Sequence, residues 1–158
     1  TDILNTAGFS SRNLRREQRD PRLAPAKGSS LGIPDSLTML VADDDIGNQE
    51  LYQAYFEEKP WQIHYTADGG EAYEGYVLRP PEVVILDVRM PIMDGFEVAK
   101  KIREYEDHKG LPCRPILLVT ADALNETMEK AKAIPGVSFL TKPIRKNVLL
   151  ESIAEALK

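Results

Sequence analysis

From residue 37 onward, short apolar runs alternate with segments whose apolar residues recur at helical spacing. Runs of four or five residues predict strands over residues 38–42, 62–66, 83–86, 116–119 and 137–140. The segments after them predict helices over residues 48–58, 71–78, 96–105, 126–134 and 147–157. Strands that alternate with helices through short connections predict a parallel sheet with helices on both faces.

The same pattern predicts what each element buries. The run 83–86, between Pro81 and Pro91, is apolar throughout and predicts a strand buried on both faces, whereas residues 62–66 alternate and predict one solvated face. Helical spacing assigns the buried positions of three helices as follows: Leu51, Ala54 and Tyr55; Phe96, Ala99 and Ile102; Leu150, Ile153, Ala154 and Leu157.

Residues 1–36 have a different composition, rich in Arg, Pro, Gly and Ser, with little apolar periodicity. We interpret them as a flexible basic linker or tail, and residues 37–158 as one domain. The basic cluster is either a solvated linker or a docking patch for an acidic partner.

The whole chain constrains the class of protein. Its net charge of −5 argues against a nucleic-acid surface over its whole length. The one cysteine, Cys113, excludes an internal disulfide, fits a reducing compartment and is predicted to pack as a small hydrophobe. No signal peptide or membrane-spanning run is visible, so we expect a cytoplasmic domain without direct membrane contact. The two histidines, His64 and His108, are predicted to lie on the surface.

Polar residues follow four of the predicted strands. Asp43 and Asp44 follow the first strand, Asp87 the third, Thr120 the fourth and Lys142 the fifth. Because the carboxyl ends of the strands share one edge, the three carboxylates are expected to lie close together, where each pair at roughly 4 Å repels by about 4 kcal/mol at an effective dielectric of about 20.

Such a cluster requires a cation or shifted pKa values. Oxygen ligands without nearby His or Cys suit Mg²⁺. A carboxylate beside a metal, a lysine and a hydroxyl can attack phosphorus and become an aspartyl phosphate. The simpler interpretation of Asp43, Asp44 and Asp45 is that they only cap the next helix.

Four motifs carry a family resemblance. Residues 40–45 read LVADDD, residues 86–95 LDVRMPIMDG, residues 119–122 VTAD and residues 140–143 LTKP. In this order and spacing they resemble the receiver domain of two-component response regulators, over about residues 37–157. The resemblance implies a flavodoxin-like, doubly wound (βα)5 sandwich with a five-stranded parallel sheet of order 2-1-3-4-5.

The resemblance also implies the roles of the acidic residues. Asp87 would be the phosphoacceptor. Asp44 and Asp87 would bind Mg²⁺ (or Mn²⁺) directly, together with the backbone carbonyl of Arg89, and Asp43 would act mostly through a water molecule.

The remaining implied roles concern the phosphoryl group. Lys142 would pair with a phosphoryl oxygen, Thr120 would hydrogen-bond the group once it arrives, and Phe139 would rotate inward on activation, although an aromatic in an outer strand can also be plain core. The Lys142–Pro143 peptide is expected to be cis. Arg89, Ala121 and Asp122 flank the site, and an Arg89–Asp122 pair across its mouth is one way of setting the lifetime of the phosphoryl group.

Residues 43–51 resemble the receivers of hybrid histidine kinases, with Asp45 where that pattern has Asn. Together with the end of the chain after the last helix, this predicts the C-terminal receiver of a hybrid kinase. Its parent chain would then be a phosphotransferase, which membrane anchoring would also suit. Its expected partners are a histidine kinase or its own kinase core, and a histidine phosphotransfer protein. The receiver itself would catalyse only its own phosphorylation and dephosphorylation. The alternatives are a stand-alone response regulator acting by protein contact and a pseudo-receiver that only binds partners.

Overall fold

The computed structural model describes residues 32–122 and 124–158. The predicted tail, residues 1–36, lies almost entirely outside the described residues. The chain divides into two units, Thr1–Asp35 and Ser36–Lys158, and all that follows concerns the second.

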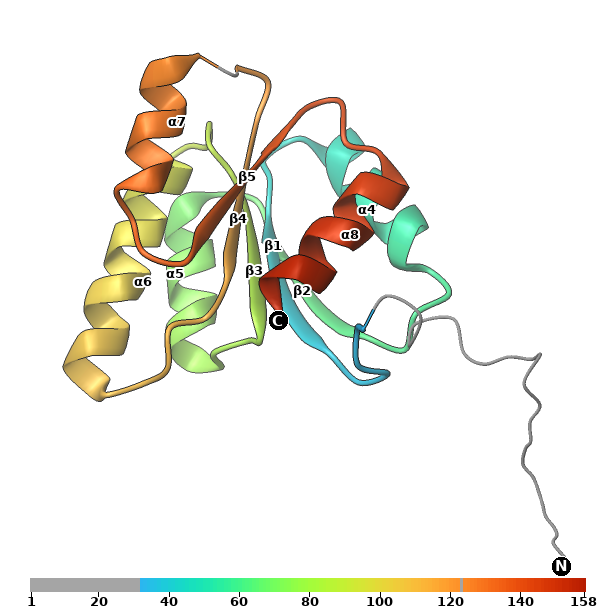
Figure 1. Cartoon of the computed structure of the whole chain (residues 1–158), viewed down its shortest axis with the longest axis horizontal. Helices are drawn as coiled ribbons and strands as arrows, with labels where there is room; N and C mark the ends of the chain where they lie inside the picture. Colours follow the sequence, from blue (N-terminus) through green and yellow to red (C-terminus); the bar gives the residue numbers. More distant parts are fainter. Residues whose placement is uncertain (1–31, 123) are drawn as a thin grey trace, which may run out of the picture. The chain divides into compact units, whose positions relative to one another are not determined.

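The second unit is built on one parallel sheet of five strands (Figure 1). The strands are β1 (Thr38–Ala42), β2 (Gln62–Thr66), β3 (Val83–Asp87), β4 (Ile116–Thr120) and β5 (Val137–Thr141). Their order is β2-β1-β3-β4-β5, so β3 is central and its neighbours are β1 and β4. This confirms the predicted flavodoxin-like topology.

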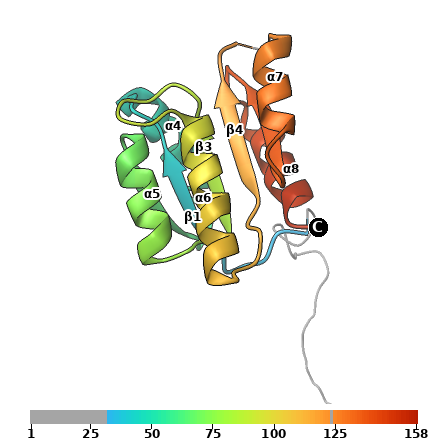
Figure 2. The same ribbon diagram turned by 90° about the vertical axis from the view of Figure 1, so that its left-hand side faces the viewer.

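Five helices cover the two faces of this sheet. They are α4 (Ile46–Phe56), α5 (Gly69–Leu78), α6 (Gly95–Lys109), α7 (Asn125–Lys132) and α8 (Lys146–Ala156). Helices α5, α6 and α7 lie on one face, and α4 and α8 on the other (Figures 1 and 2). Because all neighbouring strands are parallel, their carboxyl ends lie at the same edge of the sheet, at the top of both views.

Burial follows the position of each strand in the sheet. All residues of β3 and β4 are buried, as the continuous apolar runs predict. The edge strand β2 alternates between exposed and covered positions, and His64 on it is exposed, as predicted. Along the strands, alternate side chains point to opposite faces: Leu40, Val84 and Leu118 face the core under α5, α6 and α7.

Aspartates begin three of the helices. The side chains of Asp45, Asp68 and Asp94 each accept a hydrogen bond from a backbone N–H in the first turn of α4, α5 and α6. At α6 the Asp94 backbone N–H also donates to the Glu97 side chain, which completes a capping box. Asp45 is thus a helix cap, whereas Asp43 and Asp44 require another explanation.

The buried face of α4 differs from the prediction. Tyr52 and Phe56 are buried, whereas Ala54 is exposed and Leu51 and Tyr55 are only half-buried. The large rings, whose centroids are 6.3 Å apart, fill the space between α4 and the sheet. Helical spacing alone does not distinguish the stripe of Leu51, Ala54 and Tyr55 from the neighbouring stripe of Tyr52 and Phe56. The structure buries the second stripe, which carries two aromatic rings.

The connection from α6 to β4 contains two further differences. Helix α6 continues to Lys109, four residues beyond the predicted end, and stops where Gly110 adopts the left-handed conformation with φ 67°. Cys113, which follows, is exposed and not packed as predicted, because it lies on the loop before the strand enters the core.

Helix α6 contains a buried charge pair that the sequence analysis missed, formed by Arg103 and by Glu106 in the added length of the helix. The Arg103 guanidinium donates to Glu106 Oε1 at 2.8 Å and to the backbone carbonyls of Pro135 and Arg114. Glu106 Oε2 also accepts from the Tyr76 hydroxyl and from the Arg114 N–H. This Arg103–Glu106 cluster joins α5, α6 and the loops before β4 and β5.

Candidate functional site

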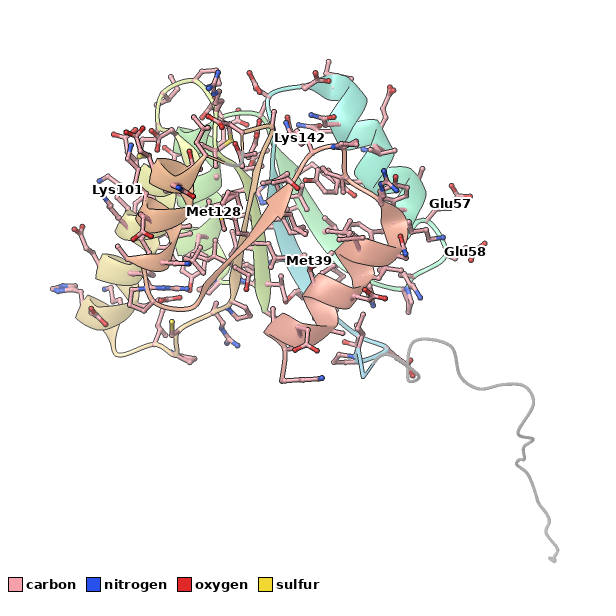
Figure 3. The ribbon with its side chains drawn as sticks, turned by 45° about the horizontal axis from the view of Figure 1, so that its top comes forward. Met39, Glu57, Glu58, Lys101, Met128 and Lys142 are labelled. Carbon is pink, nitrogen blue, oxygen red and sulfur yellow. The ribbon has the colours of Figure 1, made fainter. Side chains whose placement is uncertain are left out.

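The carboxyl ends of the strands bring the predicted site residues to one edge of the sheet. One carboxylate oxygen from each of Asp43, Asp44 and Asp87 lies within 4.8 Å of the others. The Lys142 ammonium is 3.2 Å from Asp87 Oδ1 and 3.8 Å from Asp43 Oδ2. Figure 3 shows Lys142 at this edge, after β5. The structure therefore assembles the three acids and the lysine as predicted.

Helix α4 holds Asp43 in place. The Asp43 carboxylate is fully buried and accepts hydrogen bonds from the Asp45 N–H at 2.9 Å and the Asn48 side-chain amide at 3.1 Å. The Gln49 amide donates to the backbone carbonyls of Asp43 and Thr66. Burial raises the pKa of Asp43 above its usual value, although these hydrogen bonds and Lys142 oppose the rise.

Asp87, the last residue of β3, is recessed and only 5% exposed. Burial raises its pKa to about 6, the charge of Asp43 adds to the rise, and Lys142 opposes it. Burial and the charge of Asp43 thus destabilise the ionised form of Asp87, and the Lys142 ammonium lies within reach of it. A site of this kind is suited to bind a metal cation, or a metal cation together with an anionic group.

Thr120 and Phe139 occupy neighbouring strands. Thr120 is buried at the end of β4, and its hydroxyl accepts a hydrogen bond from the Asp122 N–H at 3.0 Å. Phe139 on β5 is half-buried and packs against the core under α5, α6 and α7. This position does not test whether Phe139 moves on activation, so its role as a switch stays a prediction.

The residues that flank the site are open to solvent. Arg89 and Ala121 are exposed. Within residues 32–122 and 124–158 there is no ion pair between Arg89 and Asp122, and the Asp122 carboxylate accepts a hydrogen bond from the Leu124 N–H instead. Their effect on the lifetime of a phosphoryl group stays a prediction.

The loop that carries Lys142 is fixed by a residue that the sequence analysis predicted as core and did not assign to the site. The Tyr55 hydroxyl on α4 donates to the Ile144 carbonyl at 2.8 Å. The Lys142–Pro143 peptide is cis, as expected. Together with Asn48 and Gln49, Tyr55 makes α4 the support of the site. The available signal was the polar character of these positions in a helix that starts directly after the acidic residues.

Comparison with known proteins agrees with this geometry. The family model of the response regulator receiver domain matches residues 39–154. The chain belongs to this family.

Relatives include kinases and small regulators. The peroxide stress-activated histidine kinase mak1 of Schizosaccharomyces pombe is 31% identical over 68% of this chain, a stretch that is 7% of the kinase. The chemotaxis protein CheY of Halobacterium salinarum is 30% identical over 75% of this chain and 95% of its own length. The receiver domain of Saccharomyces cerevisiae Ssk1, solved with the histidine phosphotransfer signaling protein Ypd1, has a TM-score of 0.71 at 23% identity, over 76% of this chain and 88% of that one, a likeness of fold.

The protein is thus a receiver domain of two-component signalling, homologous both to hybrid histidine kinases, such as hybrid signal transduction histidine kinase I of Dictyostelium discoideum, and to stand-alone regulators such as CheY. The chain spans a small part of the kinases and most of CheY. Among the described helices, none combines the length and the apolar character that crossing a bilayer requires.

The raised pKa of Asp87 predicts how the stability of the metal-free protein depends on pH. Because the folded state binds this proton more tightly than the unfolded chain, the free energy of unfolding is expected to fall as the pH rises from 3.8 through about 6. The contribution of Asp87 is on the order of 3 kcal/mol. Urea denaturation in EDTA at several pH values measures it, as the difference in pH dependence between the parent and Asp87→Asn. Parallel pH profiles of the two proteins would contradict the assignment.

Proposed function

We propose that Asp87 accepts a phosphoryl group from a phosphohistidine and relays it, as part of a signalling phosphorelay. One oxygen of Asp87 attacks phosphorus, the bond between phosphorus and the imidazole nitrogen breaks, and an acyl phosphate forms. The observation that carries this proposal is the placement of Asp87 at the carboxyl end of the central strand, 3.2 Å from Lys142 and within 4.8 Å of the oxygens of Asp43 and Asp44.

The acidic cluster fits a Mg²⁺ ion. Its donor set is oxygen only. Burial raises the pKa of Asp43 and of Asp87 and Lys142 opposes the rise, so a bound cation would favour the charged form of both carboxylates. Asp43, Asp44 and Asp87, with the backbone carbonyl of Arg89, would hold the ion. When bound, Mg²⁺ neutralises charge on the phosphoryl oxygens during transfer.

Lys142 and Thr120 act on the phosphoryl group from the protein side. The Lys142 ammonium, which neutralises Asp87 before transfer, pairs with a phosphoryl oxygen afterwards. The Thr120 hydroxyl, now an acceptor from the Asp122 N–H, still has its own proton to donate to a second phosphoryl oxygen. Movement of Thr120 gives Phe139 space to turn inward, which biases an existing equilibrium of the β4–β5 side of the domain.

The sequence pattern and the relatives support a source and a destination for the phosphoryl group. The hybrid-kinase pattern in residues 43–51 and the likeness to mak1 support a receiver that works with a histidine kinase and passes the group to a histidine phosphotransfer protein. The Ssk1 receiver domain, which shares the fold, is solved with such a protein. The coverage of CheY supports the second candidate, a regulator that acts by protein contact.

Labelling by acetyl phosphate tests the proposal. The parent protein is expected to gain one phosphoryl group in Mg²⁺, as measured by intact-protein mass spectrometry, and none in EDTA. Asp44→Ala is expected to lose the labelling because it removes a metal ligand that makes no hydrogen bond or ion pair in the described structure. An unlabelled parent protein would identify a pseudo-receiver, and labelling that is equal in EDTA would exclude the metal site.

A further inference from the structure

Tyr52, on the inner face of α4, has a buried hydroxyl group without a hydrogen-bond partner. The residue is 1% exposed, and its ring lies beside that of Phe56, with the centroids 6.3 Å apart. Within residues 32–122 and 124–158, its hydroxyl is the one buried side-chain oxygen or nitrogen that makes no hydrogen bond. An unpaired buried hydroxyl costs free energy that phenylalanine, with the same ring, would avoid. Packing alone therefore does not account for tyrosine at this position.

The direction of the Tyr52 side chain brings this hydroxyl toward the acidic site. Asn48 precedes Tyr52 by one turn on the same face of α4, and its side-chain amide donates to Asp43 Oδ2 at 3.1 Å. Because helical side chains lean toward the N-terminus of their helix, the ring of Tyr52 extends from its own turn toward that of Asn48. The hydroxyl is therefore carried toward the carboxyl end of β1, where Asp43 lies.

The electrostatic surroundings of the hydroxyl agree with this placement. Burial raises the pKa of Tyr52 above its usual value, and the negative charges of Asp43 and Asp87 add to the rise. Both carboxylates therefore act on the same buried hydroxyl. Within the part of the chain that the structure describes, the Asp87 carboxylate is paired with Lys142 alone, so it keeps the capacity to accept further hydrogen bonds.

One water molecule can connect the hydroxyl to both carboxylates. A buried water is stable where two to four polar groups surround it, and Tyr52, Asp43 and Asp87 provide three. The hydroxyl donates to the water oxygen, and each hydrogen of the water goes to one carboxylate. Among the described residues, Tyr52 makes no direct hydrogen bond to either acid, so the connection requires a bridge of this kind.

We propose that Tyr52 is a positioning residue of the acidic site, whose hydroxyl holds one buried water between the carboxylates of Asp43 and Asp87. The inference rests on the proposed function. The water fixes the orientation of the two carboxylates, and its hydrogen bonds favour their charged forms. Hydrogen-bonding partners behind metal ligands orient these ligands and strengthen their hold on the ion. Tyr52 thus strengthens the binding of Mg²⁺ without contacting the ion.

Tyr52→Phe tests the inference, because it removes the hydroxyl and keeps the ring. Tyr76→Phe is the matched control: Tyr76 is also fully buried, but its hydroxyl donates to Glu106 on the other face of the sheet. The melting temperature as a function of Mg²⁺ concentration gives the dissociation constant of the ion. We expect Tyr52→Phe to raise this constant about tenfold, and to raise the Mg²⁺ concentration for half-maximal labelling by acetyl phosphate equally. Tyr76→Phe should lower the melting temperature and leave the constant unchanged.

The other outcomes separate this inference from the proposed function. Equal dissociation constants for the parent and Tyr52→Phe overturn the inference. A melting temperature of Tyr52→Phe that is lower by the same amount in EDTA and in Mg²⁺ also overturns it, since a purely structural role gives this result. A parent that responds neither to Mg²⁺ nor to acetyl phosphate overturns the proposed function instead. A high-resolution crystal structure of the parent then still tests the bridge, because the inference fails if no water lies within hydrogen-bonding distance of all three side chains.

Discussion

Replacing Asp87 with asparagine is expected to abolish labelling by acetyl phosphate. Asparagine preserves the size of the side chain, but its amide is not a nucleophile, so no acyl phosphate forms. The other two acids of the cluster cannot substitute for it: Asp43 is fully buried under hydrogen bonds from α4, and Asp44 makes no contact with Lys142. Intact-protein mass spectrometry in Mg²⁺ measures the phosphorylated fraction.

The control for this variant is Asp45→Asn. Asp45 is exposed and caps α4, and asparagine caps a helix about as well as aspartate. This variant should be labelled like the parent, since it leaves the three clustered carboxylates unchanged. Full labelling of Asp87→Asn would show that another residue is the phosphoacceptor.

Replacing Glu106 with alanine is expected to cause a large loss of stability. Glu106 is 2% exposed and accepts hydrogen bonds from Arg103, Tyr76 and the Arg114 N–H. Its removal leaves the buried Arg103 guanidinium without a counter-charge. Breaking a buried ion pair in this way costs about 3–5 kcal/mol, a large part of the stability of a typical domain. Urea denaturation at neutral pH measures the change in the free energy of unfolding.

The matched control is Glu104→Ala, because Glu104 is exposed on the same helix and should change stability by about 0.5 kcal/mol or less. If Glu106→Ala and Glu104→Ala have equal free energies of unfolding, the buried pair makes no net contribution. Labelling of the folded Glu106→Ala protein by acetyl phosphate should match that of the parent, since the Arg103–Glu106 cluster does not contact the acidic site.

The sheet and the acidic site could be predicted from the sequence because both depend on local order. A strand buried on both faces requires a continuous apolar run, as in residues 83–86, and the first polar residue after it, Asp87, marks the edge of the sheet. Once the strands are known to be parallel, their carboxyl ends must meet. Asp43, Asp87 and Lys142 were therefore predicted to lie together, although more than 40 residues separate each from the next along the chain.

The residues that support this site could be identified only in the folded structure. Whether Tyr52 or Tyr55 of α4 enters the core depends on the space left by α8 and the sheet, and Tyr55 instead reaches the loop that carries Lys142. Arg103 and Glu106 look like ordinary surface residues in the sequence, because their partners come from distant loops and another helix.

Ile92 shows the difference most clearly. The sequence determined that it follows Pro91 in the loop after the phosphoacceptor strand, and its apolar character alone predicted nothing more. The tertiary structure decided its conformation, because the backbone of α5 at Gly69 packs against the turn and holds Ile92 at a positive φ. Short-range patterns thus determined the sheet and the residues that meet at the carboxyl ends of its strands, whereas contacts between distant segments decided which side chains support the site.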